Sequence, residues 1–332
     1  MNKESRILIT GGNGLIGRYI TLELLKQGYH NIEIFSRNGF SDDKDLVQST
    51  LLDSRGSVVE FYPLSDRIEL ADVVIHCAAV VSLSPGKFQD MKQINVNGTS
   101  NVLNLCLMHK VKKVIYLSSV AAIGRNEKSD DISEETKWEE SKFNTYYGIT
   151  KYLSEQEAWR AYHEGLNITM INPCIVFGDG NWERSSLQIF EKVYKGLPYY
   201  PAGSTAIVDA VDVAKIVHAA LINEDISGER YIAAGTNISY KELFEKMSKA
   251  LSVKAPKKLA PKIILSALWR IEYLRNKLTG SDPIITKESV ISTGHKSVYD
   301  NSKSLTLNWG KYTDIDTTIN KYCAAFLQSK SK

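Results

Sequence analysis

One stretch near the start of the chain, Ile7 to Arg18, limits the possible folds more than any other. An apolar, β-branched run breaks into a glycine turn, and apolar residues then return at helical spacing, which predicts strand, turn and helix in that order. Gly12, Gly14 and Gly17 fit the G-x-G-x-x-G pattern, and Gly11 gives a wider spacing with the last two. Such glycines allow a tight turn, close approach of the backbone to a pyrophosphate and close packing of the helix on its strand. A plain glycine-rich loop is the alternative, but the position directly after a strand favours a dinucleotide site.

Short apolar runs and longer helical stretches alternate through the first half of the chain. This alternation predicts a doubly wound parallel sheet with right-handed crossovers. The segment from Pro63 to Asp72 is short for a full crossover helix, so we expect a loop or a single turn there. The expected strands after the first are 32–35, 58–62, 73–76, 114–117 and 168–177, and the expected helices are 15–27, 88–109 and 145–164.

The second half is richer in helices, which indicates a smaller cap on the sheet. We expect an α/β fold with two parts. A dinucleotide-binding domain would span 1–178, with later additions from about 207–235, and a substrate-binding cap would combine 179–206 with 236–332. The expected helices of this half are 182–195, 211–223, 240–251, 260–278 and 314–328, and short strands are expected at 207–209 and 230–233.

Composition describes an ordinary globular chain and argues against several functional classes. The 332 residues, 43% hydrophobic and 24% charged, carry a net charge of +3 with scattered basic residues, so no nucleic-acid partner is expected. The longest basic cluster, 254–262, is interrupted by prolines and is interpreted as a solvated loop. No metal site is predicted. The cysteines form no C-x-x-C pair, which fits a reducing, cytoplasmic location; they are Cys77, Cys106, Cys174 and Cys323.

No stretch of the sequence is typical of an integral membrane segment. The chain contains no run of 18 apolar residues, and no charged region followed by an apolar one opens it. The most membrane-like segment, 263–278, carries Arg270, Glu272, Arg275 and Lys277. These charges favour an amphipathic helix that covers a pocket over a bilayer contact.

Tyr147 and Lys151 lie four residues apart, and on a helix such residues are neighbours. A tyrosine with an unperturbed pKa of about 10 is a poor acid or base at neutral pH, but a nearby cation favours its phenolate form. The bare pair is also compatible with a solvated helix face. Ser118 and Ser119 favour a site, because they end a predicted parallel strand and ligands of such sheets bind at the carboxyl ends of strands.

Five motifs in order resemble the signature of the extended short-chain dehydrogenase/reductase family. Further similarity at 172–178 and 208–214 carries the resemblance through most of the chain, and the last hundred residues match loosely. The resemblance implies a Rossmann fold and an NAD(P)-dependent enzyme. The five motifs are Thr10-Gly-Gly-Asn-Gly-Leu-Ile-Gly17, His76-Cys-Ala-Ala79, Asn95-Val-Asn-Gly-Thr99, Leu117-Ser-Ser-Val-Ala-Ala-Ile-Gly124 and Tyr147-x-x-x-Lys151.

The resemblance implies a role for each matched residue. Tyr147 would be the catalytic acid or base, and Lys151 would bond the nicotinamide ribose and lower the pKa of Tyr147. Ser119 would hold the substrate oxygen, with Ser118 as the second choice, and Asn95 would have a supporting role. The cofactor would be bound by Gly11, Gly14, Leu15, Ile16, Gly17, Ser36, Arg37, Asn38, Ala78, Ala79, Ser118, Tyr147, Lys151 and Pro173.

Departures from the family patterns narrow the substrate class. Val120-Ala121 stands where nucleotide-sugar dehydratases carry acidic residues, and Ile175 and Thr205 stand where epimerases carry an asparagine and an arginine. A diphosphate without such partners would be poorly held. The pattern resembles the dihydroflavonol-reductase-like and 3β-hydroxysteroid-dehydrogenase-like branch, which acts on aldehydes, ketones or secondary alcohols. The expected function is NADP-dependent carbonyl reduction, or the reverse oxidation of an alcohol, with Tyr147 as the acid or base.

Two other functions stay open: a nucleotide-sugar epimerase or dehydratase of the same family, and a non-catalytic dinucleotide-binding sensor or scaffold. Proteins of the second kind commonly lack the tyrosine, so Tyr147 favours an enzyme.

Two further departures affect ligand contacts. Asn172 replaces an arginine common in both reductase branches, and Tyr62-Pro63-Leu64 stands where the third strand usually ends in an aspartate. Adenine recognition is therefore expected to rest on main-chain groups.

The end of the second expected strand, Ser36-Arg37-Asn38, indicates the coenzyme. A carboxylate at this place accepts hydrogen bonds from the ribose and repels a 2′-phosphate, whereas an arginine accommodates that phosphate. No carboxylate follows before Asp42, and Glu33 lies several residues before the strand end. NADP(H) is therefore predicted, and NAD(H) is left open because Arg37 could instead be a solvated turn residue.

A homodimer is expected as well. The helices at 88–109 and 145–164 carry apolar residues beyond one face and would pair with their twofold mates in a four-helix interface. Packing of these residues on the sheet and cap is the alternative. The residues concerned are Val102, Leu103, Leu105, Leu107, Tyr152, Leu153, Ala158 and Trp159.

Overall fold

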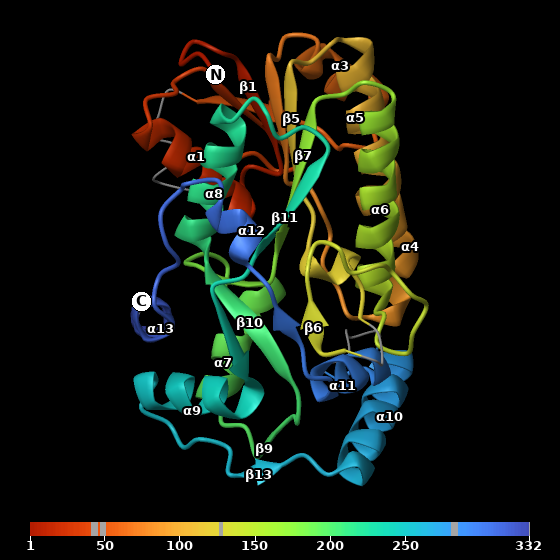
Figure 1. Ribbon diagram of the computed structural model, residues 1–332. Coiled ribbons are helices and arrows are strands. Elements are labelled where there is room, and N and C mark those ends of the chain that lie inside the picture. Colours follow the sequence, from red (N-terminus) through yellow and green to blue (C-terminus); the bar gives the residue numbers. More distant parts are fainter. Residues whose placement is uncertain (41–45, 47–50, 126–128, 280–284, 332) are drawn as a thin grey trace.

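A seven-stranded parallel sheet forms the frame of the protein, seen here in a computed structural model that describes residues 1–40, 46, 51–125, 129–279 and 285–331 (Figure 1). The strand order is β11-β7-β5-β4-β1-β2-β3, so the chain runs outward from β1 and then returns to the other side of it at β4. This order confirms the predicted doubly wound Rossmann sheet. The strands are β1 (Ile7–Thr10), β2 (Ile32–Ser36), β3 (Leu52–Arg55), β4 (Val73–His76), β5 (Lys113–Leu117), β7 (Ile168–Pro173) and β11 (Glu229–Ala233).

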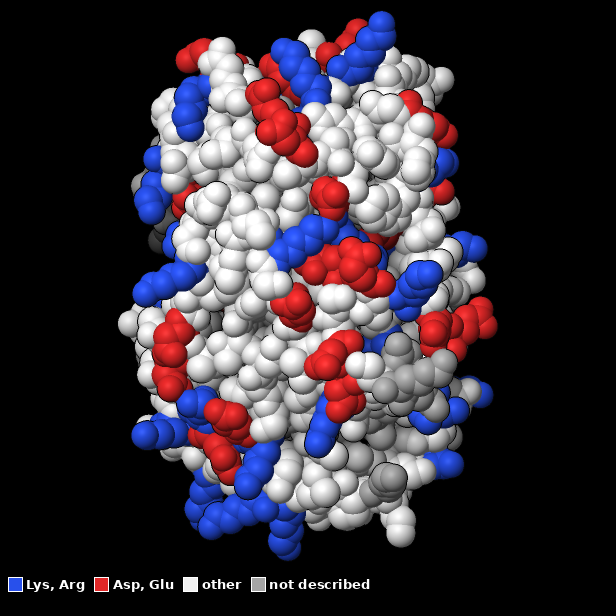
Figure 2. Space-filling model, viewed as in Figure 1, with Lys and Arg blue, Asp and Glu red and all other residues white. Residues whose placement is uncertain are grey.

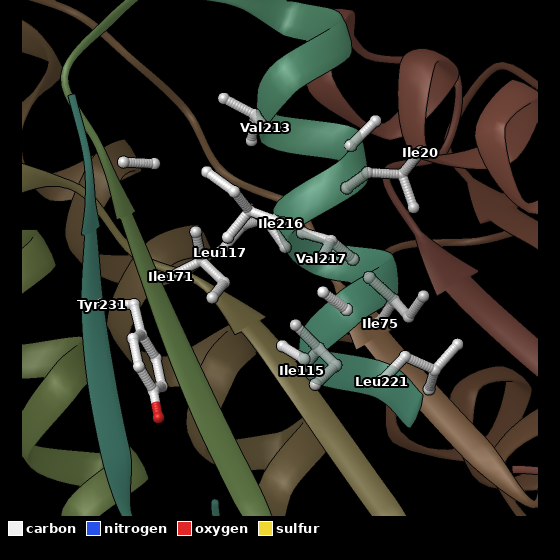
Figure 3. Close-up of a cluster of buried hydrophobic side chains, with 14 of the residues drawn as sticks. Ile20, Ile75, Ile115, Leu117, Ile171, Val213, Ile216, Val217, Leu221 and Tyr231 are labelled. Carbon is white, nitrogen blue, oxygen red and sulfur yellow. The ribbon is translucent and has the colours of Figure 1, made fainter. Parts of the chain in front are cut away.

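Helices cover both faces of this sheet because alternate strand residues point to opposite sides. Ile7 and Ile9 of β1 belong to one core and Leu8 to the other. On the first face, Val213, Ile216 and Val217 of α8 pack over the sheet (Figure 3), where each fully buried aliphatic side chain contributes about 1.5–3 kcal/mol. The first face is covered by α1 (Leu15–Lys26) and α8 (Ala210–Ile222), and the second by α3 (Phe61–Ile68), α5 (Gly98–Met108) and α6 (Tyr146–His163).

The third strand and the crossover after it differ from the expectation. The strand β3 lies at 52–55, not at 58–62, and α3 replaces the expected loop or single turn. Both elements have weak sequence patterns. The strand β3 is a polar, mostly exposed edge strand, and the helix α3 has only two buried residues, Leu64 and Ile68, one turn apart. Pro63 is tolerated because it lies in the first turn of that helix. Gly56, not Tyr62-Pro63-Leu64, therefore follows the third strand.

The run predicted as one strand over 168–177 forms two strands in different sheets. β7 ends at Pro173, which lacks the N–H that a longer ladder needs, and β8 (Ile175–Phe177) pairs with β10 (Ser204–Asp209). β10 also pairs with β12 (Thr236–Ser239), so of the two expected late additions only β11 joins the main sheet. The division into domains stays a prediction.

The remaining elements surround the three-stranded sheet. The short strands are β6 (Asp131–Ile132) with β14 (Val298–Tyr299), and β9 (Tyr199–Tyr200) with β13 (Lys258–Leu259). Phe177, Phe190 and Phe326 belong to the core of this part. The helix expected from 182 begins only at 188, after a 3₁₀ turn at 185–187. The helices are α7 (Gln188–Tyr194), α9 (Tyr240–Ala250), α10 (Lys262–Thr279), α11 (Lys287–Gly294), α12 (Ser302–Leu305) and α13 (Ile315–Lys330).

Half of the eight apolar residues that suggested a dimer are buried inside the chain. Val102, Leu103 and Leu105 of α5 and Ala158 of α6 are buried in the core on the second face of the sheet. The other four, Leu107, Tyr152, Leu153 and Trp159, are only partly buried, so an apolar contact with a partner helix and packing on the sheet and cap both stay open. The dimer stays a prediction.

Within the described ranges, no helix combines the length and apolar character needed to cross a bilayer.

Candidate active site

The glycine turn after β1 forms a cradle that side chains would fill. Gly11 has a φ of +69°, and a Cβ there would lie 2.8 Å from the backbone of Ala78. A Cβ on Gly17 would lie 2.4 Å from the carbonyl oxygen of Gly11. The helix α1 then begins after Gly14, which offers no side-chain cap, so the first N–H groups are available to a ligand. These features fit the pyrophosphate of a dinucleotide.

The end of β2 combines a buried hydroxyl with an exposed cation. The Ser36 Oγ is buried, and no hydrogen-bond partner for it lies among the described residues. Arg37 and Asn38 follow it on the surface, and no ion pair of Arg37 occurs within the described ranges. This arrangement fits a polar, anionic group at the strand end. Asp42, the next carboxylate, lies outside the described residues.

Glu33 is held inside the molecule and does not reach that strand end. Its carboxylate is 2% exposed and pairs with Arg6 at 3.2 Å and Arg67 at 3.8 Å. It also accepts a hydrogen bond from the Ser54 hydroxyl. These contacts occupy the carboxylate, as its position within the strand suggests.

Ser119 and Tyr147 are brought together by a close contact between the end of β5 and the start of α6. Thr145 caps that helix by accepting a hydrogen bond from the Gly148 N–H at 3.0 Å. A Cβ on Gly148 would lie 3.1 Å from the carbonyl oxygen of Ala121, so the glycine lets the helix approach the 3₁₀ turn at 120–122. Burial raises the pKa of Tyr147, and a hydrogen bond with Ser119 partly opposes that rise, which reflects the proximity of the two side chains.

Lys151 is buried one turn after Tyr147. Its ammonium group donates to the Tyr116 hydroxyl at 2.9 Å and to the Leu117 carbonyl at 2.8 Å. Burial lowers the pKa of Lys151, whereas burial raises the pKa of Tyr147. The charge of Lys151 opposes the second effect, because a nearby cation stabilises the phenolate. The pair can therefore hold and release one proton at the Tyr147 hydroxyl.

The family is decided by a comparison with known sequences. The model described as the NAD dependent epimerase/dehydratase family matches residues 7–234, which include every element described above for the site. The chain belongs to this family. It is an NAD(P)-dependent enzyme of the extended short-chain dehydrogenase/reductase type.

Individual relatives of this dehydrogenase/reductase agree with that assignment. A putative dihydroflavonol 4-reductase from Synechocystis sp. is 27% identical over 90% of this chain and 87% of the relative. Cinnamoyl-CoA reductase 1 from Petunia hybrida is 27% identical over 73% of this chain and 76% of its own. The solved dTDP-glucose 4,6-dehydratase from Streptomyces venezuelae, which contains NAD, shares the fold with a TM-score of 0.77 at 18% identity and covers 98% of both chains.

Asn95 holds the loop after β4 against α6 in this dehydrogenase/reductase. It lies in a π-helical turn, Lys92–Asn97, between α4 (Phe88–Met91) and α5. Its amide bonds both the N–H and the carbonyl of Val80, at 2.7 and 2.9 Å, and donates to Thr150 at 3.0 Å. The supporting role of Asn95 stays a prediction. Ala78, next to Gly11, begins the loop that Asn95 fixes, and Ala79 is exposed there.

Ser118 faces a buried network that sequence reasoning missed. Its hydroxyl donates to Glu155 at 2.5 Å, and Asn172 donates to the same carboxylate at 2.8 Å and to the Ser119 carbonyl at 3.0 Å. Arg230 pairs with the other oxygen of Glu155 at 2.9 Å. The signal for Glu155 was its position four residues after Lys151, on the same helix face. The network engages the Ser118 hydroxyl, whereas Ser119 remains on the Tyr147 side.

His76 is the other titratable group beside this site that sequence reasoning did not use. Its ring is hydrogen-bonded to Thr10 at 2.6 Å and to Thr99 at 2.9 Å. Burial and the charge of Lys151 lower its pKa to about 3, so the ring stays neutral near pH 7 and cannot act as the acid. Pro173, at the end of β7, is buried beside Ala233 of β11. Leu15 and Ile16, which open α1, are half-buried.

Proposed function

We propose that this enzyme reduces an aldehyde or ketone with NADPH, or oxidises the corresponding alcohol with NADP. The observation that carries the proposal is the meeting of Ser119, Tyr147 and Lys151 at the carboxyl end of β5. The bound dinucleotide supplies or accepts the hydride. In reduction, Ser119 and Tyr147 would hold the carbonyl oxygen, which takes the Tyr147 proton as the carbonyl carbon gains hydride. The phenolate left behind would be stabilised by Lys151.

Departures at the substrate side support a carbonyl substrate over a nucleotide sugar. Ile175 and Thr205 lie on β8 and β10, and Thr205 is buried, so neither side chain offers a diphosphate the asparagine or arginine contact of an epimerase. Asn172 is engaged by Glu155 and Ser119. The names of the two curated relatives given above, both reductases, support the same reaction class.

The direct test is a screen of aldehydes, ketones and alcohols with each coenzyme, followed by nicotinamide absorbance. We expect absorbance to change with at least one carbonyl substrate. Conversion of a nucleotide sugar without net change in the coenzyme would instead establish the epimerase or dehydratase function. Coenzyme binding without turnover on either class would favour the sensor or scaffold.

Replacement of Arg37 with Ala is expected to separate the coenzymes. A charge-assisted hydrogen bond from Arg37 to a 2′-phosphate would contribute about 1.5–3 kcal/mol, so the dissociation constant for NADPH should rise roughly 10- to 100-fold while that for NADH changes little. Added salt should weaken NADPH selectively. Fluorescence titration measures both constants, with Arg160→Ala as the control because Arg160 lies at the far end of α6. Equal constants for NADPH and NADH in the wild type would contradict the NADP preference.

We also propose a cytoplasmic homodimer. All four cysteines are free thiols, three of them buried, which supports a reducing location. The dimer rests on the family resemblance and on the partly exposed apolar residues of α5 and α6, which are Leu107, Tyr152, Leu153 and Trp159. Light scattering at micromolar concentration should give twice the chain mass, and a monomer mass would refute the dimer.

A further inference from the structure

The helix α10 turns an apolar stripe toward solvent. The residues of the stripe follow one another at spacings of eight, three and four positions. These spacings place them on one face of a helix. Exposed large apolar residues are ordinary when scattered, but a contiguous stripe marks an interaction surface. The sequence favours a helix that covers a pocket, whereas the structure leaves this face uncovered by the described residues. The stripe consists of Ile263, Ile271, Leu274 and Leu278, which are 84%, 61%, 58% and 79% exposed.

Basic residues border the stripe. Arg270 and Lys277 are exposed on the same helix, and each lies over an aromatic ring, that of Trp269 at 4.5 Å and of Tyr273 at 5.1 Å. Tryptophan and tyrosine beside cations are typical of the boundary between an apolar phase and water. The acidic residue of the helix, Glu272, is mostly covered and pairs with Arg275 at 2.7 Å.

The segment just before α10 extends this charged border. Lys257 and Lys258 are exposed at β13, next to the half-exposed Leu259. Figure 1 shows β13 and α10 at the same end of the molecule, and Figure 2 shows basic side chains gathered at that end. Residues 252–279 include seven basic and one acidic residue, a net charge of +6, while the whole chain carries only +3. The rest of the chain therefore carries a net charge of −3.

The positive charge of this region favours an anionic bilayer over a second copy of the chain as the partner. A twofold contact between two copies would set the same patch against itself, so that its cations would repel one another. An anionic bilayer surface offers both an apolar boundary for the stripe and phosphates for the cations. The helix does not qualify as a membrane span, so it would lie in the plane of the interface.

We propose that α10 and β13 form a docking surface for an anionic lipid bilayer. The stripe enters the boundary between headgroups and acyl chains, and Lys257, Lys258, Arg270 and Lys277 contact the phosphates. The docked face also adjoins the candidate active site through the next helix, because Glu288 of α11 accepts a hydrogen bond from the Tyr146 N–H at 2.9 Å.

The test is co-sedimentation of the full chain with extruded vesicles, either of phosphatidylcholine alone or with about one third phosphatidylserine. We expect binding to the mixed vesicles that weakens with salt. The double variant Ile271→Asp/Leu274→Asp should lose roughly tenfold or more of that binding, because two charged side chains would have to enter the apolar boundary. The variant Lys257→Glu/Lys258→Glu should lose the preference for phosphatidylserine.

A matched control replaces two exposed apolar residues elsewhere. Leu70 and Met108 are 48% and 55% exposed and lie beyond α3 and at the end of α5, and Leu70→Asp/Met108→Asp should bind vesicles as the wild type does. Circular dichroism and thermal unfolding establish that each variant is folded. Absence of vesicle binding by the wild type, or binding unchanged by Ile271→Asp/Leu274→Asp, would overturn the proposal. So would self-association that this variant abolishes in the absence of vesicle binding.

Discussion

Turnover of the Tyr147→Phe variant is expected to fall by ~100-fold or more, because the variant keeps the ring but lacks the transferable proton. Coenzyme binding should survive, since the phenol ring and Lys151 both remain. The measurement is steady-state turnover on the substrate found by the carbonyl screen, together with the dissociation constant of the coenzyme.

Tyr146→Phe is the matched control, because the two tyrosines are neighbours at the start of the same helix. The Tyr146 ring packs on Phe88 with centroids 4.9 Å apart, and removal of its hydroxyl leaves that packing in place. Normal turnover is expected. If Tyr147→Phe also retained near-normal turnover, the assignment of Tyr147 as proton donor would be wrong.

The variant Lys151→Ala tests the assignment of Tyr147 through the pH dependence of turnover. The ammonium group lowers the pKa of Tyr147, so its loss should raise that pKa further. Alcohol oxidation requires the phenolate, and its pH profile should therefore move to higher pH. Turnover and coenzyme affinity should also fall. A profile unchanged in position would show that Lys151 does not tune Tyr147.

Removal of Arg230 is expected to destabilise the fold by about 3 kcal/mol, because the Glu155 carboxylate would be left buried with two neutral donors and without its ion-pair partner. Arg230 also donates to the Thr136 carbonyl at 3.1 Å and to that of Glu134, so the variant frees the loop around 134–136 as well. Urea unfolding of Arg230→Met measures the loss. Arg160→Ala removes two partly exposed ion pairs, with Glu157 and Glu164, and should cost less than about 1 kcal/mol.

The double variant Arg230→Met/Glu155→Gln distinguishes lost pairing from lost packing. A neutral amide at 155 needs no cation, so the double variant should recover part of the stability lost by Arg230→Met. A double variant no more stable than the single one would mean that the buried charge is not the cause.

Local patterns in the sequence predicted the parts of the site that depend on neighbours in the chain. The turn from Gly11 to Gly17 was predicted because Gly14 and Gly17 are required by contacts with Gly11 inside the same turn. Tyr147 and Lys151 share one helix face, so their spacing alone indicates that they lie together. The pair Ser118 and Ser119 was placed by the rule that ligands of parallel sheets bind at the carboxyl ends of strands, and the choice of Ser119 came from the family resemblance.

Features that depend on distant partners could not be predicted in the same way. Glu155 and Arg230 are 75 residues apart, and neither has a local pattern that names the other. The edge strand β3 is too polar to show the apolar alternation of a buried strand. For α10 the period of the apolar residues was visible, but only the arrangement of the surrounding elements determines whether that face is covered.

The separation of charge described above makes the whole molecule an electric dipole, with +6 on residues 252–279 and −3 on the rest. A dipole near an anionic surface is turned before it touches, within about one Debye length, or roughly 8–10 Å at ordinary ionic strength. The molecule would thus arrive with its β13 end toward the membrane. A larger fraction of its collisions would then have the orientation that allows binding. Salt should consequently slow the capture of the protein by a negative surface more than it hastens the departure.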